Sequence, residues 1–296
     1  MKVVLAGSHG FIGSYLKRYF KERGNTVVAL SRKPGGKEPF WDPYARQMEK
    51  THLEGADVVI NLAGENVLGR WTQTKIERIR QSRYAATSFL CDTILTLNHP
   101  PKLYIGASAV GFYGERGREK LTEESTSGHG YLAAICRHWE ELTEPLIRAN
   151  IRVALCRFGI VLGKEGGAFK RMLPPFKLGI GGQLGDGKQM VSWITIEDLA
   201  GACQHIIAHK ELDGAINFCA PGAVTNAEMT QALGEVLHRP TKFPLPKFIL
   251  KLLYGSGVEV FLSSIHAEPA KLLKSGYQFH HPEVKNAFFS LLSRDR

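Results

Sequence analysis

Three glycines near the amino terminus have a spacing that would let the backbone bind a diphosphate. Gly7, Gly10 and Gly13 follow a short apolar run and open a segment with helical periodicity. In this context the first glycine permits a tight turn, the second lets a diphosphate approach, and the third lets the helix pack against the sheet. Free N–H groups at the helix start would then hold the anion. The predicted dinucleotide-binding segment is Gly7, Ser8, His9, Gly10, Phe11, Ile12 and Gly13.

The residues after the second predicted strand favour one nicotinamide cofactor over the other. Sites for NAD usually place an acidic residue there, which binds the ribose 2′-hydroxyl. This chain has Ser31, Arg32 and Lys33 instead. An arginine can bind a 2′-phosphate through two hydrogen bonds and a serine can add a hydroxyl, whereas a carboxylate would repel the phosphate. We therefore expect NADP, with Ser31 and Arg32 at the 2′-phosphate. The alternative is that the two cations are solvated loop charges.

Apolar strands that alternate with helices position these residues. Helical spacing predicts helices over Phe11–Arg23 and Trp71–Leu97, and the strands are short apolar runs. Such alternation requires parallel strand pairing with helices on both faces of the sheet. We therefore expect an α/β fold with a doubly wound parallel Rossmann sheet. Its predicted strands are Lys2–Ala6, Thr26–Leu30, Ala56–Leu62, Lys102–Ser108 and Ile151–Phe158.

The pattern changes after about residue 160, where glycine-rich and proline-marked segments begin. We expect residues 1–160 to form the NADP-binding Rossmann core. Residues 161–296 would form a smaller, partly helical lobe on the substrate side, with elements that return to the core and a C-terminal module at about 245–296. Gly179–Gly187 is too rich in glycine for regular structure, so we predict a mobile loop over the cleft. Asp198 is interpreted as a charge at a helix amino terminus.

Composition excludes several classes of protein. The 296 residues contain no run of eighteen apolar side chains, which excludes a spanning helix, and the amino terminus lacks a signal-peptide pattern. Five separated cysteines suit neither a disulfide framework nor a metal site, so we expect buried thiols and no bound metal. The net charge of +10 is spread along the chain without a nucleic-acid-binding motif. We expect a cytoplasmic protein with no nucleic-acid partner and no membrane partner.

Several motifs together resemble the extended short-chain dehydrogenase/reductase superfamily. The matching stretches include VVLAGSHGFIG, SRKPG, VVINLAGENV, GASAVGFYG, SWITIEDL and NFCAPGAVTNAEM. The chain is most similar to the atypical "epimerase family protein" branch, and its last fifty or so residues resemble the small C-terminal module of that branch. The resemblance covers nearly the whole chain.

The resemblance implies further contacts with the cofactor. It places Leu62, Ala63 and Gly64 in the loop that lines the adenosine-side ribose. It makes Arg83 an arginine of the long helix that can turn toward the cofactor. The segment from Gly159 to Val161 would run near the nicotinamide end, with both of these residues among the candidate contacts.

The same resemblance implies an active site that is incomplete in this chain. Catalytic members of the superfamily use a serine or threonine with Tyr-x-x-x-Lys, in which the lysine favours the tyrosinate. Ser108 fits the hydroxyl and Tyr131 fits the tyrosine, but position 135 holds Ile135. The alternative role of Tyr131 is simple packing. Tyr113 is another phenol for which packing is the favoured interpretation.

Three functions are compatible with these residues. The first is an NADP-dependent oxidoreductase or epimerase-type enzyme acting on a small molecule that the sequence does not identify, with Ser108 polarising an oxygen and Tyr131 moving a proton. The second is a non-catalytic NADP-binding sensor or scaffold that lost the lysine. The third, a DNA-associated regulator, depends only on charge, and we expect no duplex binding. A homodimer would follow only from analogy of fold.

Overall fold

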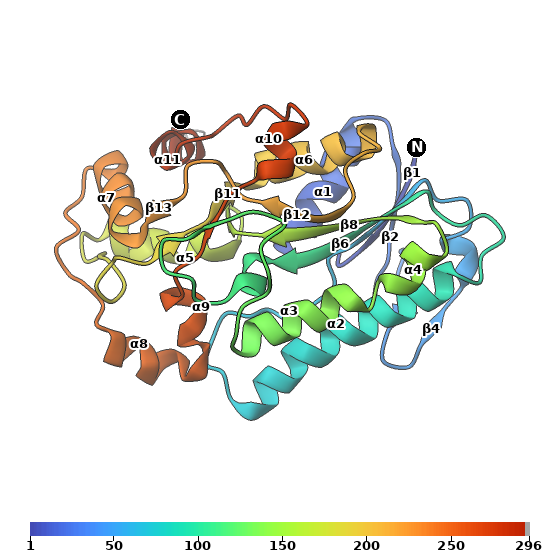
Figure 1. Ribbon diagram of the computed structural model, residues 1–296, viewed down its shortest axis with the longest axis horizontal. Coiled ribbons are helices and arrows are strands. Elements are labelled where there is room, and N and C mark those ends of the chain that lie inside the picture. Colours follow the sequence, from blue (N-terminus) through green and yellow to red (C-terminus); the bar gives the residue numbers. More distant parts are fainter. Residues whose placement is uncertain (294–296) are drawn as a thin grey trace.

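A parallel sheet of six strands forms the centre of the molecule (Figure 1). The computed structural model describes residues 1–293. Neighbouring strands pair in parallel in the order β12-β8-β6-β5-β1-β2. This order confirms the predicted doubly wound sheet. The strands are β1 (Lys2–Ala6), β2 (Thr26–Ala29), β5 (Val58–Asn61), β6 (Leu103–Ala109), β8 (Arg152–Phe158) and β12 (Gly214–Phe218).

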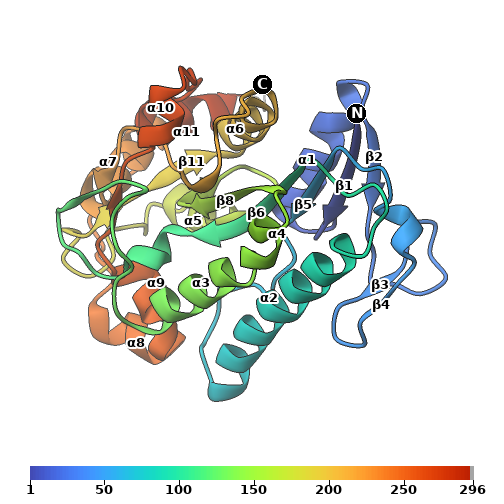
Figure 2. The same cartoon turned by 45° about the vertical axis from the view of Figure 1, so that its right-hand side comes forward.

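Helices cover both faces of this sheet (Figure 2). Helices α1 (Phe11–Glu22) and α6 (Ile196–Ala208) pack on one face, and α2 (Gln73–Ile94), α3 (Tyr131–Glu141) and α4 (Glu144–Arg148) pack on the other. An apolar core lies on each face of the sheet, and successive residues of a strand pack into the two cores alternately. In β1, Leu5 packs with the α1 side and Val4 with the α2 side. Burial on both faces explains why the strands are continuous apolar runs without a polar face.

The C-terminal part forms a smaller lobe that is partly helical, as predicted. Helices α5 (Gly167–Lys177), α7 (Asn226–Leu237) and α11 (Val284–Ser293) share one apolar core. Helix α5 contains Pro174 and Pro175 within it, which the sequence analysis described only as a proline-marked segment. Residues 214–218 return to the main sheet as β12. Further short elements are α8 (Lys247–Tyr254), α9 (Glu259–Leu262), α10 (Ala270–Lys274), β9 (Ile160–Leu162) and β11 (Trp193–Thr195).

Small paired strands complete the chain. The glycine-rich segment 179–187 contains no helix, and within it Leu184 forms an isolated bridge with Leu245. Besides the pair of β9 and β11, the short strands form a hairpin after β2 and two further pairs that join segments distant in the sequence. These strands are β3 (Trp41–Asp42) with β4 (Gln47–Met48), β10 (Met190–Val191) with β13 (Val224–Thr225), and β7 (Lys120–Leu121) with β14 (His266–Ala267).

Asp198 connects α6 to the C-terminal segment. Thr195 caps α6, and its hydroxyl accepts a hydrogen bond from the Asp198 amide. The Asp198 carboxylate is fully buried and accepts hydrogen bonds from the Tyr277 hydroxyl and from the backbone N–H groups of His280 and His281. The predicted position at a helix amino terminus is therefore confirmed. The carboxylate also holds residues 277–281 against the sheet-covering helix.

The cysteines are structural. All five are buried and unpaired, as expected. Burial raises the pKa of the Cys91, Cys136 and Cys203 thiols to about 12, so these groups are protonated at neutral pH and are weak nucleophiles. No helix within residues 1–293 combines the length and the hydropathy needed to cross a bilayer.

Candidate functional site

The glycine turn between β1 and α1 has the geometry predicted for it. Gly7 has a φ of +80°, which favours glycine, and a Cβ there would lie 2.7 Å from the carbonyl carbon of Leu62. A Cβ on Gly13 would lie 2.1 Å from the Gly7 carbonyl oxygen. No real side chain tolerates such a distance to backbone. The glycines therefore permit a close approach of the turn, the first turn of α1 and the loop after β5.

The start of α1 is open to an anion. Gly10 is the N-cap residue, no side chain caps the helix, and its first turn contains no acidic residue. The Gly10 N–H is bonded to the Gly7 carbonyl, which closes the turn. A helix start leaves backbone N–H groups without partners inside the helix, and these groups carry the positive end of the helix dipole. The arrangement fits a diphosphate.

Phe11 connects this turn to the C-terminal half of the chain. Added Cβ atoms on Gly163 and Gly166 would each lie 2.6 Å from its ring, and one on Gly167 would lie 3.0 Å away. Glycines in the loop between β9 and α5 therefore let that loop lie directly on the ring. Phe11 was predicted as part of the dinucleotide-binding segment, and its contact with this loop was not predicted. The close spacing of Gly163, Gly166 and Gly167 was the feature of the sequence that could have indicated a close contact of this loop.

Ser31 and Arg32 lie after β2, where the 2′-phosphate is expected. Ser31 is buried and its hydroxyl oxygen accepts a hydrogen bond from the Lys33 N–H, which shapes the turn. Arg32 is exposed. The pKa of Glu65, in the loop after β5, is lowered mainly by its hydrogen bond with Lys75 and further by the charges of Lys75, Arg78 and Arg32. Cations that follow β2 and that lie on α2 thus act on the loop after β5.

Arg83 lies under that loop. Its Nη1 donates to the carbonyls of Glu65 and Ile79, at 3.1 and 2.9 Å, and its guanidinium lies 5.1 Å from the centre of the Trp139 ring. A Cβ on Gly64 would lie 3.3 Å from its Cζ atom. Burial lowers the pKa of this guanidinium. The structure therefore brings Leu62, Ala63 and Gly64 together with both the glycine turn and Arg83.

One acidic residue near the turn was missed by the sequence analysis. The Glu38 carboxylate contacts Lys17 of α1 and lies 2.9 Å from Nε2 of His9. It holds the segment after Ser31 against the glycine turn and α1. Nothing in the spacing of Glu38 indicated this contact, because it depends on the path of the intervening loop.

Gly159 and Val161 lie where strands of the two parts of the chain meet. A Cβ on Gly159 would lie 2.6 Å from the Ser192 carbonyl oxygen, so glycine is needed for this approach. Val161 lies in β9, pairs with Ile194 of β11, and packs on the core of the α1 side. These contacts give both residues a structural role in addition to the cofactor contact that the resemblance implied.

Ser108 belongs to a buried polar network. Its side chain is 2% exposed and its hydroxyl donates to Glu140 of α3 at 2.5 Å. Glu140 also accepts two hydrogen bonds from Arg157, at 2.9 and 2.8 Å. Ser108 has the same orientation in β6 as Tyr104, toward α2 and α3. Its hydroxyl could orient a substrate oxygen only after leaving Glu140.

Tyr113 extends this network. Its hydroxyl is buried, accepts a hydrogen bond from Arg157 at 2.9 Å and donates to Asn217 at 2.7 Å. Burial raises the pKa of Tyr113 to about 12, and the neighbouring Arg157 opposes that rise. A buried phenol with these partners is a structural group, as the favoured interpretation held.

Tyr131 and Ile135 have different environments on α3. Tyr131 is the first residue of the helix and is 54% exposed, so its phenol is accessible to a ligand. Ile135 is 4% exposed and packs with Trp71, Ile76 and Ile79. A lysine at position 135 would put its charge into this apolar cluster. Within residues 1–293, no hydrogen bond joins Tyr131 to Ser108.

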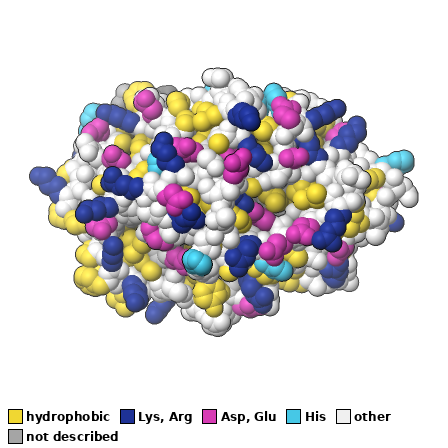
Figure 3. Space-filling model, viewed as in Figure 1, with side chains coloured by type: hydrophobic (Ala, Val, Ile, Leu, Met, Phe, Trp, Pro, Cys, Tyr) yellow, Lys and Arg dark blue, Asp and Glu magenta, His cyan; other side chains and the backbone are white. Residues whose placement is uncertain are grey.

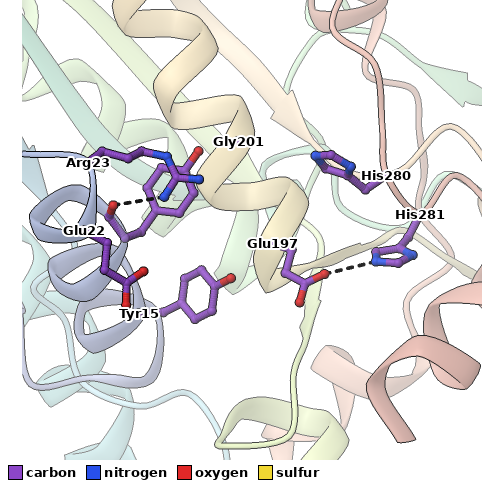
Figure 4. A pocket seen from close by; sticks show the side chains of 8 residues that line it. Tyr15, Glu22, Arg23, Glu197, Gly201, His280 and His281 are labelled. Carbon is purple, nitrogen blue, oxygen red and sulfur yellow. Dashed lines mark hydrogen bonds and ion pairs between the residues drawn. The ribbon is translucent and has the colours of Figure 1, made fainter. Parts of the chain in front are cut away.

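An open groove of about 520 Å³ lies away from the cofactor residues (Figure 4). Tyr15 and Glu22 of α1 and the adjacent Arg23 face Glu197 of α6 across it, and His281 lies 3.1 Å from the Glu197 carboxylate. The groove therefore lies toward the carboxyl end of α1, whereas the glycine turn lies at its amino end. Ligands of doubly wound sheets bind at the carboxyl ends of the strands. We therefore assign the cofactor cleft to the glycine turn and not to this groove.

Two family models match the chain. The NAD dependent epimerase/dehydratase family matches residues 3–219, and a domain of unknown function, DUF1731, matches residues 245–291. The second match lies within the C-terminal segment that the sequence analysis set apart at about 245–296.

Relatives match over nearly their whole length. The epimerase family protein Mb2239 of Mycobacterium bovis is 36% identical over 289 residues, which cover 96% of this chain and 95% of that protein. The chloroplastic SDR39U1 homolog of Arabidopsis thaliana is 36% identical over 306 residues, covering 99% and 87%. A crystal structure of the human epimerase family protein SDR39U1 with NADPH superimposes with a TM-score of 0.91, at 32% identity, and covers 99% of both chains.

Proposed function

Because the chain belongs to the NAD dependent epimerase/dehydratase family, we propose that it binds NADPH and transfers hydride between this cofactor and an oxygen-bearing carbon of a small molecule. The open amino terminus of α1 beside the glycine turn is the observation that carries the first part. The human relative of the same fold was crystallised with NADPH. The bound cofactor supplies the hydride, and all other tasks fall to the side chains of this chain.

The residues of the cleft fit a phosphorylated dinucleotide. The first turn of α1 would bind the diphosphate, since it has neither a side-chain cap nor an acidic residue. Arg32 would bind the 2′-phosphate, and Ser31 would hold the turn that presents it. The loop at 62–64 would lie along the adenosine-side ribose, with Arg83 beneath it.

Replacement of Arg32 tests the cofactor assignment. For Arg32→Ala we expect the Kd of NADPH to rise about 10- to 100-fold, because a charged hydrogen-bonding partner of the 2′-phosphate is lost. The Kd of NADH should change less than about twofold, since NADH has no such phosphate. Titration calorimetry with both cofactors measures the two constants. Arg148→Ala is the control, because it removes an exposed arginine side chain from α4, outside the predicted cofactor contacts. Equal losses for both cofactors, or tighter NADH binding by the unaltered chain, would contradict the assignment.

Tyr131 is the side chain that we propose for proton transfer. Its phenol is exposed at the start of α3, whereas the Ser108 hydroxyl is buried against Glu140. An accessible phenol can give a proton to an oxygen that gains charge during hydride transfer. Ser108 would take part only after exchange of its hydrogen bond, so its contribution is the smaller of the two.

Tyr131→Phe separates catalysis from binding. Once a panel of carbonyl compounds has identified one that oxidises NADPH, we expect this variant to lower kcat by about 100-fold or more, with the Kd of NADPH unchanged. Tyr44→Phe is the matched control, because Tyr44 is also 54% exposed. Full activity of Tyr131→Phe would remove the phenol from the mechanism.

A non-catalytic sensor or scaffold is the second candidate. The apolar surroundings of Ile135 favour it, because they leave no place for the cation that activates the tyrosine elsewhere in the superfamily. NADPH binding without turnover of any carbonyl compound in the panel would support this function. The two candidates share the cofactor cleft and differ only in the chemistry at Tyr131.

A further inference from the structure

Helix α8 presents an unusual number of apolar side chains to solvent. Phe248 and Leu252 are 72% and 70% exposed, and their spacing of four places them on one side of the helix. Leu253, next to them, is 52% exposed. Leu250, on the other side, is 1% exposed and anchors α8 to the protein. The helix is therefore fixed in place while these large apolar side chains remain more than half exposed.

A second apolar segment lies beside α8. The Gly185 N–H donates to the Leu245 carbonyl at 2.9 Å, and a Cβ on Gly182 would lie 2.0 Å from the Phe243 carbonyl oxygen. Residues 178–185 thus run along the segment that leads into α8. Residues 176–186 and 239–254, which include α8, together form what we call the α8 surface. Its large apolar members are Leu178, Ile180, Phe243, Phe248, Leu252 and Leu253, each more than half exposed.

The α8 surface is strongly basic. Segments 176–186 and 239–254 contain five basic residues, which are Lys177, Arg239, Lys242, Lys247 and Lys251, and one acidic residue, Asp186. Asp186 lies 3.5 Å from Lys247 and so offsets one of these charges. In Figure 3, yellow and dark-blue side chains gather at the lower left, where Figure 1 places α8 at a corner of the molecule.

We propose that the α8 surface docks on a membrane that contains anionic lipids. Phe248, Leu252 and their neighbours would enter the boundary between headgroups and acyl chains, while the lysines contact the acidic headgroups. Because α8 lies at a corner of the molecule, its exposed side chains can contact an extended membrane surface. Such peripheral contact needs no spanning segment, so the hydropathy argument against a spanning helix does not bear on it. The proposal is independent of the proposed function.

Sedimentation of the full chain with vesicles tests the proposal. We expect binding to phosphatidylcholine vesicles that contain about a third phosphatidylserine, weaker binding without phosphatidylserine, and release by high salt. Phe248→Asp combined with Leu252→Asp should reduce the bound fraction at least about tenfold. Phe289→Asp is the matched control, because Phe289 of α11 is 66% exposed and lies outside the α8 surface.

A second pair of changes leaves the apolar side chains intact. Lys247→Gln combined with Lys251→Gln should weaken binding to the anionic vesicles about fivefold for each lysine, with little effect on neutral vesicles. NADPH binding and the melting temperature, measured for every variant, show that it is folded. Absence of vesicle binding by the unaltered chain, or equal binding to neutral and anionic vesicles, would overturn the proposal. So would a dimer in lipid-free solution that Phe248→Asp abolishes, because the occupant would then be a second copy of the chain.

Discussion

Arg157→Gln is expected to lower the free energy of unfolding by about 3–5 kcal/mol, because it leaves a buried carboxylate without its cation. The side chains of Arg157 and Glu140 are 5% and 11% exposed, and two hydrogen bonds of 2.9 and 2.8 Å join them. Arg157 also donates to Tyr113, and its guanidinium lies 3.5 Å from the centre of the Phe112 ring. Unfolding in urea, followed by tryptophan fluorescence, measures the loss.

An exposed ion pair of the same residue types provides the control. Arg148 and Glu144 lie four residues apart on α4, with side chains 77% and 53% exposed. Arg148→Gln should cost at most about 0.5 kcal/mol, since water already solvates both partners. Combining Arg157→Met with Glu140→Gln should restore part of the lost stability, because no unpaired charge remains. If Arg157→Gln lowered the free energy of unfolding as little as Arg148→Gln does, the Glu140 carboxylate would not depend on Arg157 for compensation of its charge, and the prediction would be wrong.

Local signals were sufficient for five of the six strands of the main sheet. The strand predicted at Lys2–Ala6 has these bounds in the structure. The strand β12 was missed. Its partner β8 ends more than fifty residues earlier, and its five residues carry no helical or alternating pattern. Pairing of this kind depends on tertiary packing, which a single short window of sequence does not contain.

The predicted cofactor contacts and the predicted catalytic residues depend on different kinds of sequence signal. The turn from Gly7 to Gly13 is contiguous, so its geometry follows from local conformational limits. Ser108 lies in a strand that is buried on both faces, and the sequence of such a strand does not show which face leads to a cleft. Arg157 was a missed signal. A charge within the apolar run IRVALCRF requires a buried partner, and Glu140 of α3 provides it.

Asp198→Asn is expected to destabilise the protein by about 2–4 kcal/mol, because a fully buried acceptor is replaced by a group with one oxygen fewer. The carboxylate accepts from the hydroxyls of Thr195 and Tyr277 and from the N–H groups of His280 and His281. An amide satisfies at most part of this set and brings its own N–H donors toward them. Urea unfolding measures the global cost, and hydrogen exchange of the amides at 280 and 281 measures the local release.

Helix α7 offers a matched control, because Thr225 and Glu228 occupy the same capping positions as Thr195 and Asp198. Glu228 is exposed, and its carboxylate accepts hydrogen bonds from the Thr225 N–H and hydroxyl within the capping box. Glu228→Gln should therefore cost no more than about 1 kcal/mol, the usual value of a cap. A larger loss for Asp198→Asn, together with faster exchange at 280 and 281, identifies the contact with the C-terminal segment as the source. Equal losses at the two positions would mean that Asp198 acts only as a helix cap and that other contacts hold this segment.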